Sequence, residues 1–186
     1  MTPVRPDPLS ALGTPSGIPS WISSARAEAL EDAVFFSGAA LCQLHLVFER
    51  VDVPHALLRD RLALRAAEAC VALSGRPERA GELRDALHLL RPGDLPGPAG
   101  ETCLAWRRAA ERPVSIKALG RALPAFEPGQ IATWLDAGKG APVTRAAMAL
   151  EAVLREAPRA EIAGLILADA ALAQSLSWDH LVPLLA

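Results

Sequence analysis

A short run rich in proline and glycine, residues 91–100, is the feature that most constrains how this chain folds. It holds three prolines and three glycines, and both residue types disfavour the interior of a helix. The sequence on either side is dominated by alanine, leucine, arginine and glutamate, which favour helices. Valine, isoleucine and threonine do not cluster as a strand would require. The pattern predicts an all-α protein in which residues 91–100 form a stiff corner between helices.

Apolar spacing predicts a single-domain helical bundle of seven to eight helices. In residues 33–48 apolar side chains occupy two helical faces, so we expect a central apolar helix near residues 24–50, capped by Ser20 or Ser23. Residues 1–19 carry five prolines and two glycines and are expected to form a flexible arm. The helical domain, residues 20–186, is expected to have a four-helix half (20–112) and a half with shorter helices (113–186). Gly75 is expected to end the second helix.

Charge and cysteine usage favour a cytoplasmic protein without a general nucleic-acid-binding surface. The 19 basic and 21 acidic residues give a net charge of −2, and neither half of the chain is basic. Cys42, Cys70 and Cys103 form an odd set without metal-ligand spacing, which predicts three reduced core cysteines. No cationic leader opens the chain. Residues 33–48 are interpreted as too short and too polar to span a bilayer, so no membrane partner is expected.

Histidines and acids stand at helical spacing in two places. His45 and Glu49 are four residues apart, and Asp85 and His88 are three apart, which places each pair on one helical face. A metal centre in a helical bundle needs matching ligands from several helices, and these pairs are only fragments of such a set. We therefore assign no catalytic, cofactor-binding or metal-ligating residue and expect no cofactor. A metal-dependent helical-bundle enzyme remains an alternative.

Residues 115–137 have the length of a helix-turn-helix. Two prolines, Pro124 and Pro128, crowd the turn, and the second helix offers only Gln130 and Thr133 as polar groups for reading bases. A pair of short packing helices is the favoured interpretation. A DNA-binding regulator that uses residues 115–137 is the alternative, with nucleic acid a possible but not a favoured partner.

Asp169 interrupts an otherwise apolar helical seam formed by Leu165, Leu172 and Leu176. A carboxylate in such a place needs a partner or a position near the surface. A structural salt bridge to an arginine is the favoured interpretation, and a catalytic acid is the alternative. The sequence closes on an apolar stretch, residues 178–186. This stretch is expected either to dock on the core or to lie under a further helical layer, and self-association through it is possible.

Charged residues gather at and beside the corner. They form a candidate structural or recognition cluster made of Arg84, Asp85, Arg91, Asp94, Trp106 and Arg107. We expect Asp94 or Asp85 to pair with one of the arginines and to pin the corner against the neighbouring helices. Ligand capture by the same arginines is the alternative.

Several sequence blocks together resemble an uncharacterised bacterial domain-of-unknown-function family of all-helical proteins. The blocks are residues 31–35 (EDAVF), 38–41 (GAAL), 61–67 (RLALRAA), 83–86 (LRDA), 91–100 (RPGDLPGPAG), 106–108 (WRR) and 182–186 (VPLLA), with Trp178. The resemblance extends from about residue 21 to the end. It implies a helical fold and a cytoplasmic bacterial setting, transfers no catalytic residue, and implies that the chain is truncated at its carboxyl end.

These observations favour a non-enzymatic helical interaction or regulatory module whose partner is a protein. The interpretation depends on two features. The sequence contains no complete set of catalytic residues, and the apolar stretch at its end is expected to pack against a partner or a further helical layer.

Overall fold

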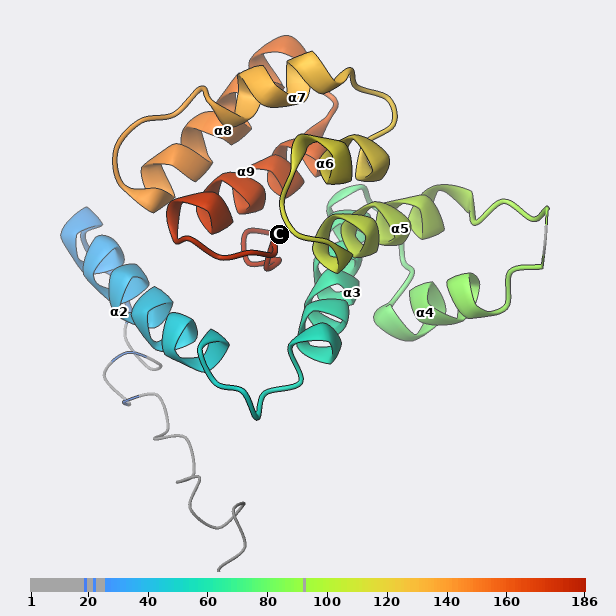
Figure 1. Ribbon diagram of the computed structural model, residues 1–186. Helices are drawn as coiled ribbons and strands as arrows, with labels where there is room; N and C mark the ends of the chain where they lie inside the picture. Colours follow the sequence, from blue (N-terminus) through green and yellow to red (C-terminus); the bar gives the residue numbers. More distant parts are fainter. Residues whose placement is uncertain (1–18, 20–21, 23–25, 92) are drawn as a thin grey trace, which may run out of the picture. The chain divides into compact units, whose positions relative to one another are not determined.

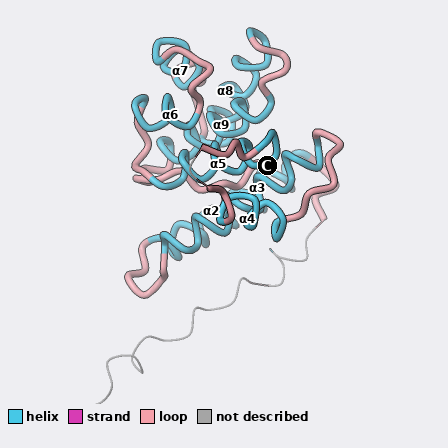
Figure 2. Tube along the Cα trace, turned by 90° about the vertical axis from the view of Figure 1, so that its right-hand side faces the viewer, coloured by secondary structure: helices cyan, strands magenta, loops and turns pink. Residues whose placement is uncertain are grey.

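The computed structural model describes Pro19, Ile22, residues 26–91 and residues 93–186. Within these residues the chain forms eight α-helices and no strand (Figure 1, Figure 2). The prediction of an all-α protein with seven to eight helices is confirmed. Of the predicted arm, residues 1–19, only Pro19 is described, and the two proposed caps, Ser20 and Ser23, lie outside the described residues.

Local sequence signals set several helix ends. The helices are α2 (Leu30–Phe48), α3 (His55–Leu73), α4 (Ala80–His88), α5 (Gly97–Glu111), α6 (Ile116–Ala122), α7 (Pro128–Leu135), α8 (Pro142–Glu156) and α9 (Glu161–Ser175). The Ser115 hydroxyl accepts a hydrogen bond from the Ala118 N–H and caps α6. Prolines occupy the first turns of α5, α7 and α8, where a missing N–H costs little. Gly75 follows α3 with a φ of 75°, as predicted.

The helix α2 lies in the first of two compact units, residues 1–54 and residues 55–186. It begins at Leu30, where the Asp32 carboxylate accepts a hydrogen bond from the Ala29 N–H at 3.2 Å. None of its 19 residues is buried, and Leu30 and Val34 are 76% and 65% exposed. The predicted burial of this helix at the centre of a bundle is therefore not found within the first unit. Apolar faces show that a helix can be covered, but they do not identify what covers it.

The helix α9 is the centre of the second unit. Ten of its residues, from Ala163 to Ala173, are buried, and it contacts α5, α7 and α8. Figure 1 shows α8 running beside it. A side chain at Gly164 would place its Cβ 2.7 Å from the Leu150 Cδ1 atom, so the glycine permits this close approach. The sequence boundary expected near residue 112 lies inside this unit.

Alanine supplies about half of the buried apolar residues, and two tryptophans supply the largest buried side chains. Trp106 on α5 is fully buried, and its indole N–H points at the Cys70 Sγ atom on α3 at 3.4 Å. Trp134 on α7 donates to the Glu156 carboxylate at 2.9 Å. Small residues thus bring the helices close together, and the two indoles fill the space that remains.

The three cysteines do not share one environment. Cys70 and Cys103 are buried, as predicted, whereas Cys42 on α2 is exposed. Burial raises the pKa of both the Cys70 and the Cys103 thiols. The prediction of three core cysteines is therefore wrong for Cys42, because the helix that carries it has no buried residue.

The last residues, 178–186, form an extended segment that we call the C-terminal strap. The Val114 N–H donates to the Asp179 carbonyl at 2.8 Å, beside the bridge between Pro113 and His180. Leu181 and Val182 are buried at 0% and 2% exposure. Of the two arrangements expected for this stretch, the structure has the first: the strap docks on the core of the second unit.

Candidate functional site

The second unit contains an open groove with an apolar lining, which we call the apolar groove. It lies between the end of α3, the first half of α5, the α6–α7 connection and the start of α9, and its volume is about 740 Å³. The residues that line it are Val71, Ser74, Arg76, Pro96, Pro98, Glu101, Thr102, Leu104, Ala105, Arg108, Ala122, Leu123, Pro124, Ala125, Phe126, Arg159, Ala160, Ile162 and Ala163. Its size lies in the range of small-molecule sites.

Three arginines and one acid lie at this groove. Arg76 is bonded to Glu78, outside the lining. Arg108 and Arg159 are exposed and form no ion pair with any described residue. With Glu101 as its one acidic residue, the lining carries an excess of positive charge.

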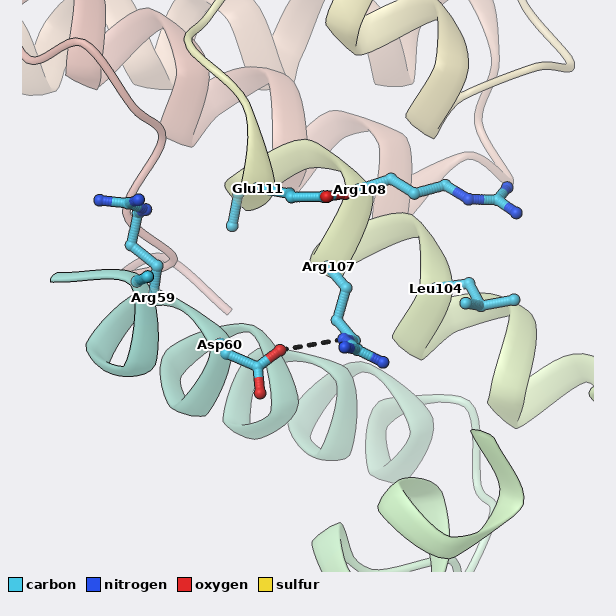
Figure 3. Close-up of a pocket in the computed structure, with 8 residues that line it drawn as sticks. Arg59, Asp60, Leu104, Arg107, Arg108 and Glu111 are labelled. Carbon is cyan, nitrogen blue, oxygen red and sulfur yellow. Dashed lines mark hydrogen bonds and ion pairs between the residues drawn. The ribbon is translucent and has the colours of Figure 1, made fainter. Parts of the chain in front are cut away.

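A smaller cavity of about 390 Å³ lies between α3 and α5 (Figure 3). Across it the Arg107 Nε–H donates to the Asp60 carboxylate at 2.9 Å, and both side chains are partly exposed. Figure 3 shows the Arg59 and Arg108 side chains pointing to opposite sides, away from this pair. Burial lowers the pKa of Arg59, and Arg59 in turn contributes, after burial, to a lowered pKa of His180 on the strap. The arginine side chains at this cavity therefore do not converge on one point.

The six residues predicted as a cluster make separate contacts. The exposed Arg84 and Asp85 side chains pair with each other at 2.8 Å. The Asp94 carboxylate accepts a hydrogen bond from the Arg91 backbone N–H at 3.0 Å, which is an exposed turn contact. Trp106 is buried in the core and Arg107 pairs with Asp60.

The expected pairing between an acid and an arginine is thus found at the Arg84–Asp85 pair, but this pair joins adjacent, exposed residues. Asp94 bonds a backbone N–H of the corner rather than an arginine side chain. Neither contact ties the corner to α5, so pinning of the corner by these acids is not what the described residues show. Pro92, within the corner, lies outside the described residues.

Asp169 is the buried polar side chain at the centre of the second unit, with 1% exposure. Its Oδ2 atom accepts hydrogen bonds from the backbone N–H groups of Leu184 at 3.1 Å and Leu185 at 3.4 Å. Its Oδ1 atom is buried and has no hydrogen-bond partner among the described residues. Burial raises the pKa of Asp169 to about 7, and the two backbone N–H groups oppose this rise.

The salt bridge predicted for Asp169 is therefore wrong. The carboxylate binds the strap through backbone donors, and these donors come from residues that lie 15 and 16 positions later in the sequence. The pattern of side chains in the sequence cannot identify such a partner, because every non-proline residue has the same backbone N–H.

Comparison with known proteins identifies the family. A family model described as a protein of unknown function, DUF1403, matches residues 6–186. The chain belongs to the DUF1403 family. No curated protein and no solved structure matches it. The resemblance to an uncharacterised helical family is thus confirmed, and membership in DUF1403 assigns no activity to the groove, the cavity or the strap.

The predicted metal-site fragments of this DUF1403 chain lie on different helices. His45 lies in the last turn of α2 and His88 in the last turn of α4, while Asp85 is paired with Arg84. Among the described residues, no group of three or more histidine, cysteine, aspartate or glutamate side chains could hold a metal ion.

The two short helices expected in residues 115–137 are present as α6 and α7. The Gln130 side-chain oxygen accepts from the Glu127 N–H at 3.3 Å, and the Thr133 hydroxyl donates to the Gly129 carbonyl at 3.0 Å. Both candidate base-reading side chains of this DUF1403 protein therefore form hydrogen bonds to backbone groups at the start of the same helix. Ile131 and Leu135 on the same helix are buried, which fits the expected pair of packing helices.

Sequence reasoning missed the apolar groove altogether. Its lining comes from four separate segments, and its polar members, such as Arg108 and Arg159, have no motif spacing. The available signal was weak: Pro96 and Pro98 lie at the start of α5 and Pro124 lies between α6 and α7, and the folded unit brings these positions to one groove.

Proposed function

We propose that this protein is a non-enzymatic helical interaction module whose binding element is α2. The observation that carries the proposal is the exposure of its apolar side chains: Leu30, Val34, Phe35 and Leu46 are all more than half exposed on a helix without a buried residue. Large apolar surfaces in water mark interaction sites. Helical stability in proteins comes mainly from packing of the apolar face, so a covering surface would stabilise α2.

Two kinds of cover fit a long apolar helix. By length and composition α2 could cross a membrane, which corrects the expectation that this stretch is too short and too polar; core helices and signal sequences pass the same test. Its flanks favour a protein instead. Acids Glu31 and Asp32 lie in its first turn and Glu49 follows its end. The two arginines beside it, Arg26 and Arg50, stand one at each end, so neither end carries an excess of basic residues. Membrane-spanning helices are typically flanked by lysine and arginine on the cytoplasmic side.

The partner that suits α2 is therefore a protein with an apolar groove and a basic rim, bound in a cytoplasmic, bacterial setting. This mode of binding lays the apolar side of a helix into a groove, and the ends of the helix contribute charge. Charge complementarity of this kind raises the rate of association and selects the partner.

Site-specific photo-cross-linking in living cells tests the proposal. A photoreactive amino acid replaces Val34 on α2 in the full chain, and the matched control places it at Val143 on α8, which is also apolar and 49% exposed. We expect a discrete protein adduct from position 34 and none from position 143. Absence of an adduct at position 34, or equal adducts at both, would refute α2 as the binding element.

A second measurement separates the membrane from the protein. Cys42 is the exposed thiol on α2, so its rate of maleimide labelling reports coverage of this helix. We expect phosphatidylcholine vesicles and mixed phosphatidylcholine–phosphatidylglycerol vesicles to leave this rate unchanged. Protection of Cys42 by either kind of vesicle would replace the protein partner with a membrane.

A further inference from the structure

The apolar groove of the second unit points to a ligand that α2 does not explain. We infer that this groove binds a fatty-acid-like molecule, a single long apolar chain that ends in a carboxylate. The inference concerns residues 71–163 alone and stands whether or not α2 binds a protein.

The lining offers apolar contact and few hydrogen bonds. Its two hydroxyl groups are engaged within their own helices: Ser74 donates to the Cys70 carbonyl at 3.0 Å, and Thr102 donates to the Pro98 carbonyl at 3.1 Å. A sugar, a nucleobase or an extended peptide needs several polar partners and would lose its bonds to water here. An alkyl chain makes no such demand.

Prolines and an aromatic contact restrict the walls of the groove. Pro96, Pro98 and Pro124 fix the backbone at two of its edges. The Phe126 ring lies edge to face against the buried Trp134, with ring centroids 5.2 Å apart. A preformed apolar surface loses little conformational entropy on binding, which favours affinity for a flexible chain.

Charge at the rim selects the head group of the ligand. Arg108 and Arg159 line the groove from α5 and from the start of α9, and neither forms an ion pair with a described residue. Guanidinium groups bind carboxylates through short, charge-assisted hydrogen bonds. Glu101 opposes an anion, so the lining as a whole favours one negative charge rather than several.

Calorimetric titration of the full chain with dodecanoate, below the concentration at which it forms micelles, tests the inference. We expect one molecule bound per chain, and about tenfold weaker binding of dodecanol, which has the same tail without the charge. Dodecyltrimethylammonium, with the opposite charge, should not bind measurably. Equal affinity for dodecanoate and dodecanol would overturn the role of the arginines, and no binding of dodecanoate would overturn the inference.

Three variants locate the site. Arg159→Gln should weaken dodecanoate binding by about tenfold, whereas Arg121→Gln, an exposed arginine of α6 outside the lining, should leave it unchanged. Ala125→Trp adds bulk at an exposed position of the groove wall and should abolish binding. Far-ultraviolet circular dichroism confirms that each variant folds. Unchanged binding by Ala125→Trp and Arg159→Gln would place the ligand elsewhere and refute the inference.

Light scattering on the same samples checks the competing occupant. If Ala125→Trp converts a dimer of the natural chain to a monomer while dodecanoate binds neither protein, the groove is covered by a second copy. That result also overturns the fatty-acid inference, and it leaves the cross-linking test of α2 to be judged on its own.

Discussion

Replacing Asp169 with asparagine should change how the stability of this protein depends on pH. Asparagine keeps an oxygen that accepts the Leu184 and Leu185 N–H groups but carries no charge. The pKa of Asp169 rises from 3.8 to about 7 in the folded chain. A raised pKa means that the folded state binds the proton more tightly than the unfolded state. This stabilisation is therefore fully present below the unfolded value and is lost as the pH rises through about 7.

The magnitude follows from the two pKa values. Between the unfolded pKa of 3.8 and about pH 7 each pH unit is worth ~1.4 kcal/mol, so Asp169 lowers the free energy of unfolding by about 4 kcal/mol across that range. The Asp169→Asn variant lacks this loss. We expect the two proteins to have similar stability at about pH 4 and the variant to be more stable at about pH 8.

Urea unfolding followed by tryptophan fluorescence measures the difference, because Trp106 and Trp134 are both buried. Burial lowers the pKa of His180, but His180 is present in both proteins and its contribution cancels in the comparison. Asp136→Asn is the matched control, because Asp136 is exposed and forms no ion pair with a described residue, and its pH profile should run parallel to that of the natural chain. Parallel pH profiles for the natural chain and Asp169→Asn would refute the reasoning.

Three further predictions concern packing and exposure. Leu167→Ala should lower the free energy of unfolding by about 2–5 kcal/mol because Leu167 is fully buried, whereas Leu41→Ala on α2 should cost much less; urea midpoints compare them. Gly138→Ala should lower the melting temperature, since its Cβ would lie 2.8 Å from the Arg145 Cα atom and the overlap costs about 1–3 kcal/mol; an unchanged melting temperature would contradict this. Maleimide should label Cys42 rapidly and the two buried cysteines only after unfolding, as mass spectrometry of the folded and unfolded protein would show.

Helix ends marked by a local signal could be predicted from the sequence. Ser115 and Pro128 mark the starts of α6 and α7, and Gly75 marks the end of α3, because caps, prolines and glycines act through their own backbone. The choice of central helix could not be predicted. Residues 33–48 and α9 are both apolar on several faces, and the periodicity of apolar residues does not indicate which of two such helices is packed among other helices.

Features that depend on distant partners were predicted least well. The burial of Asp169 is readable from its seam, but its backbone partners at Leu184 and Leu185 are not. The groove likewise depends on how four segments meet, so neither Arg108 nor Arg159 stands out in the sequence. At the corner, the alternating charges predicted one cluster that included Trp106, whereas the Trp106 side chain is buried in the core.

The alanine-rich core implies an unusual pattern of tolerance to mutation. Where about half of the buried apolar residues are alanine, there is little side chain to remove, and most substitutions add atoms. Enlarging a residue such as Ala149 or Ala170, each with 0% exposure, forces neighbouring helices apart. In a library of random variants, depletion at the core should therefore follow the volume gained more closely than the volume lost. Natural sequence change in this core is expected to be restricted mainly to exchanges among glycine, alanine, serine and cysteine.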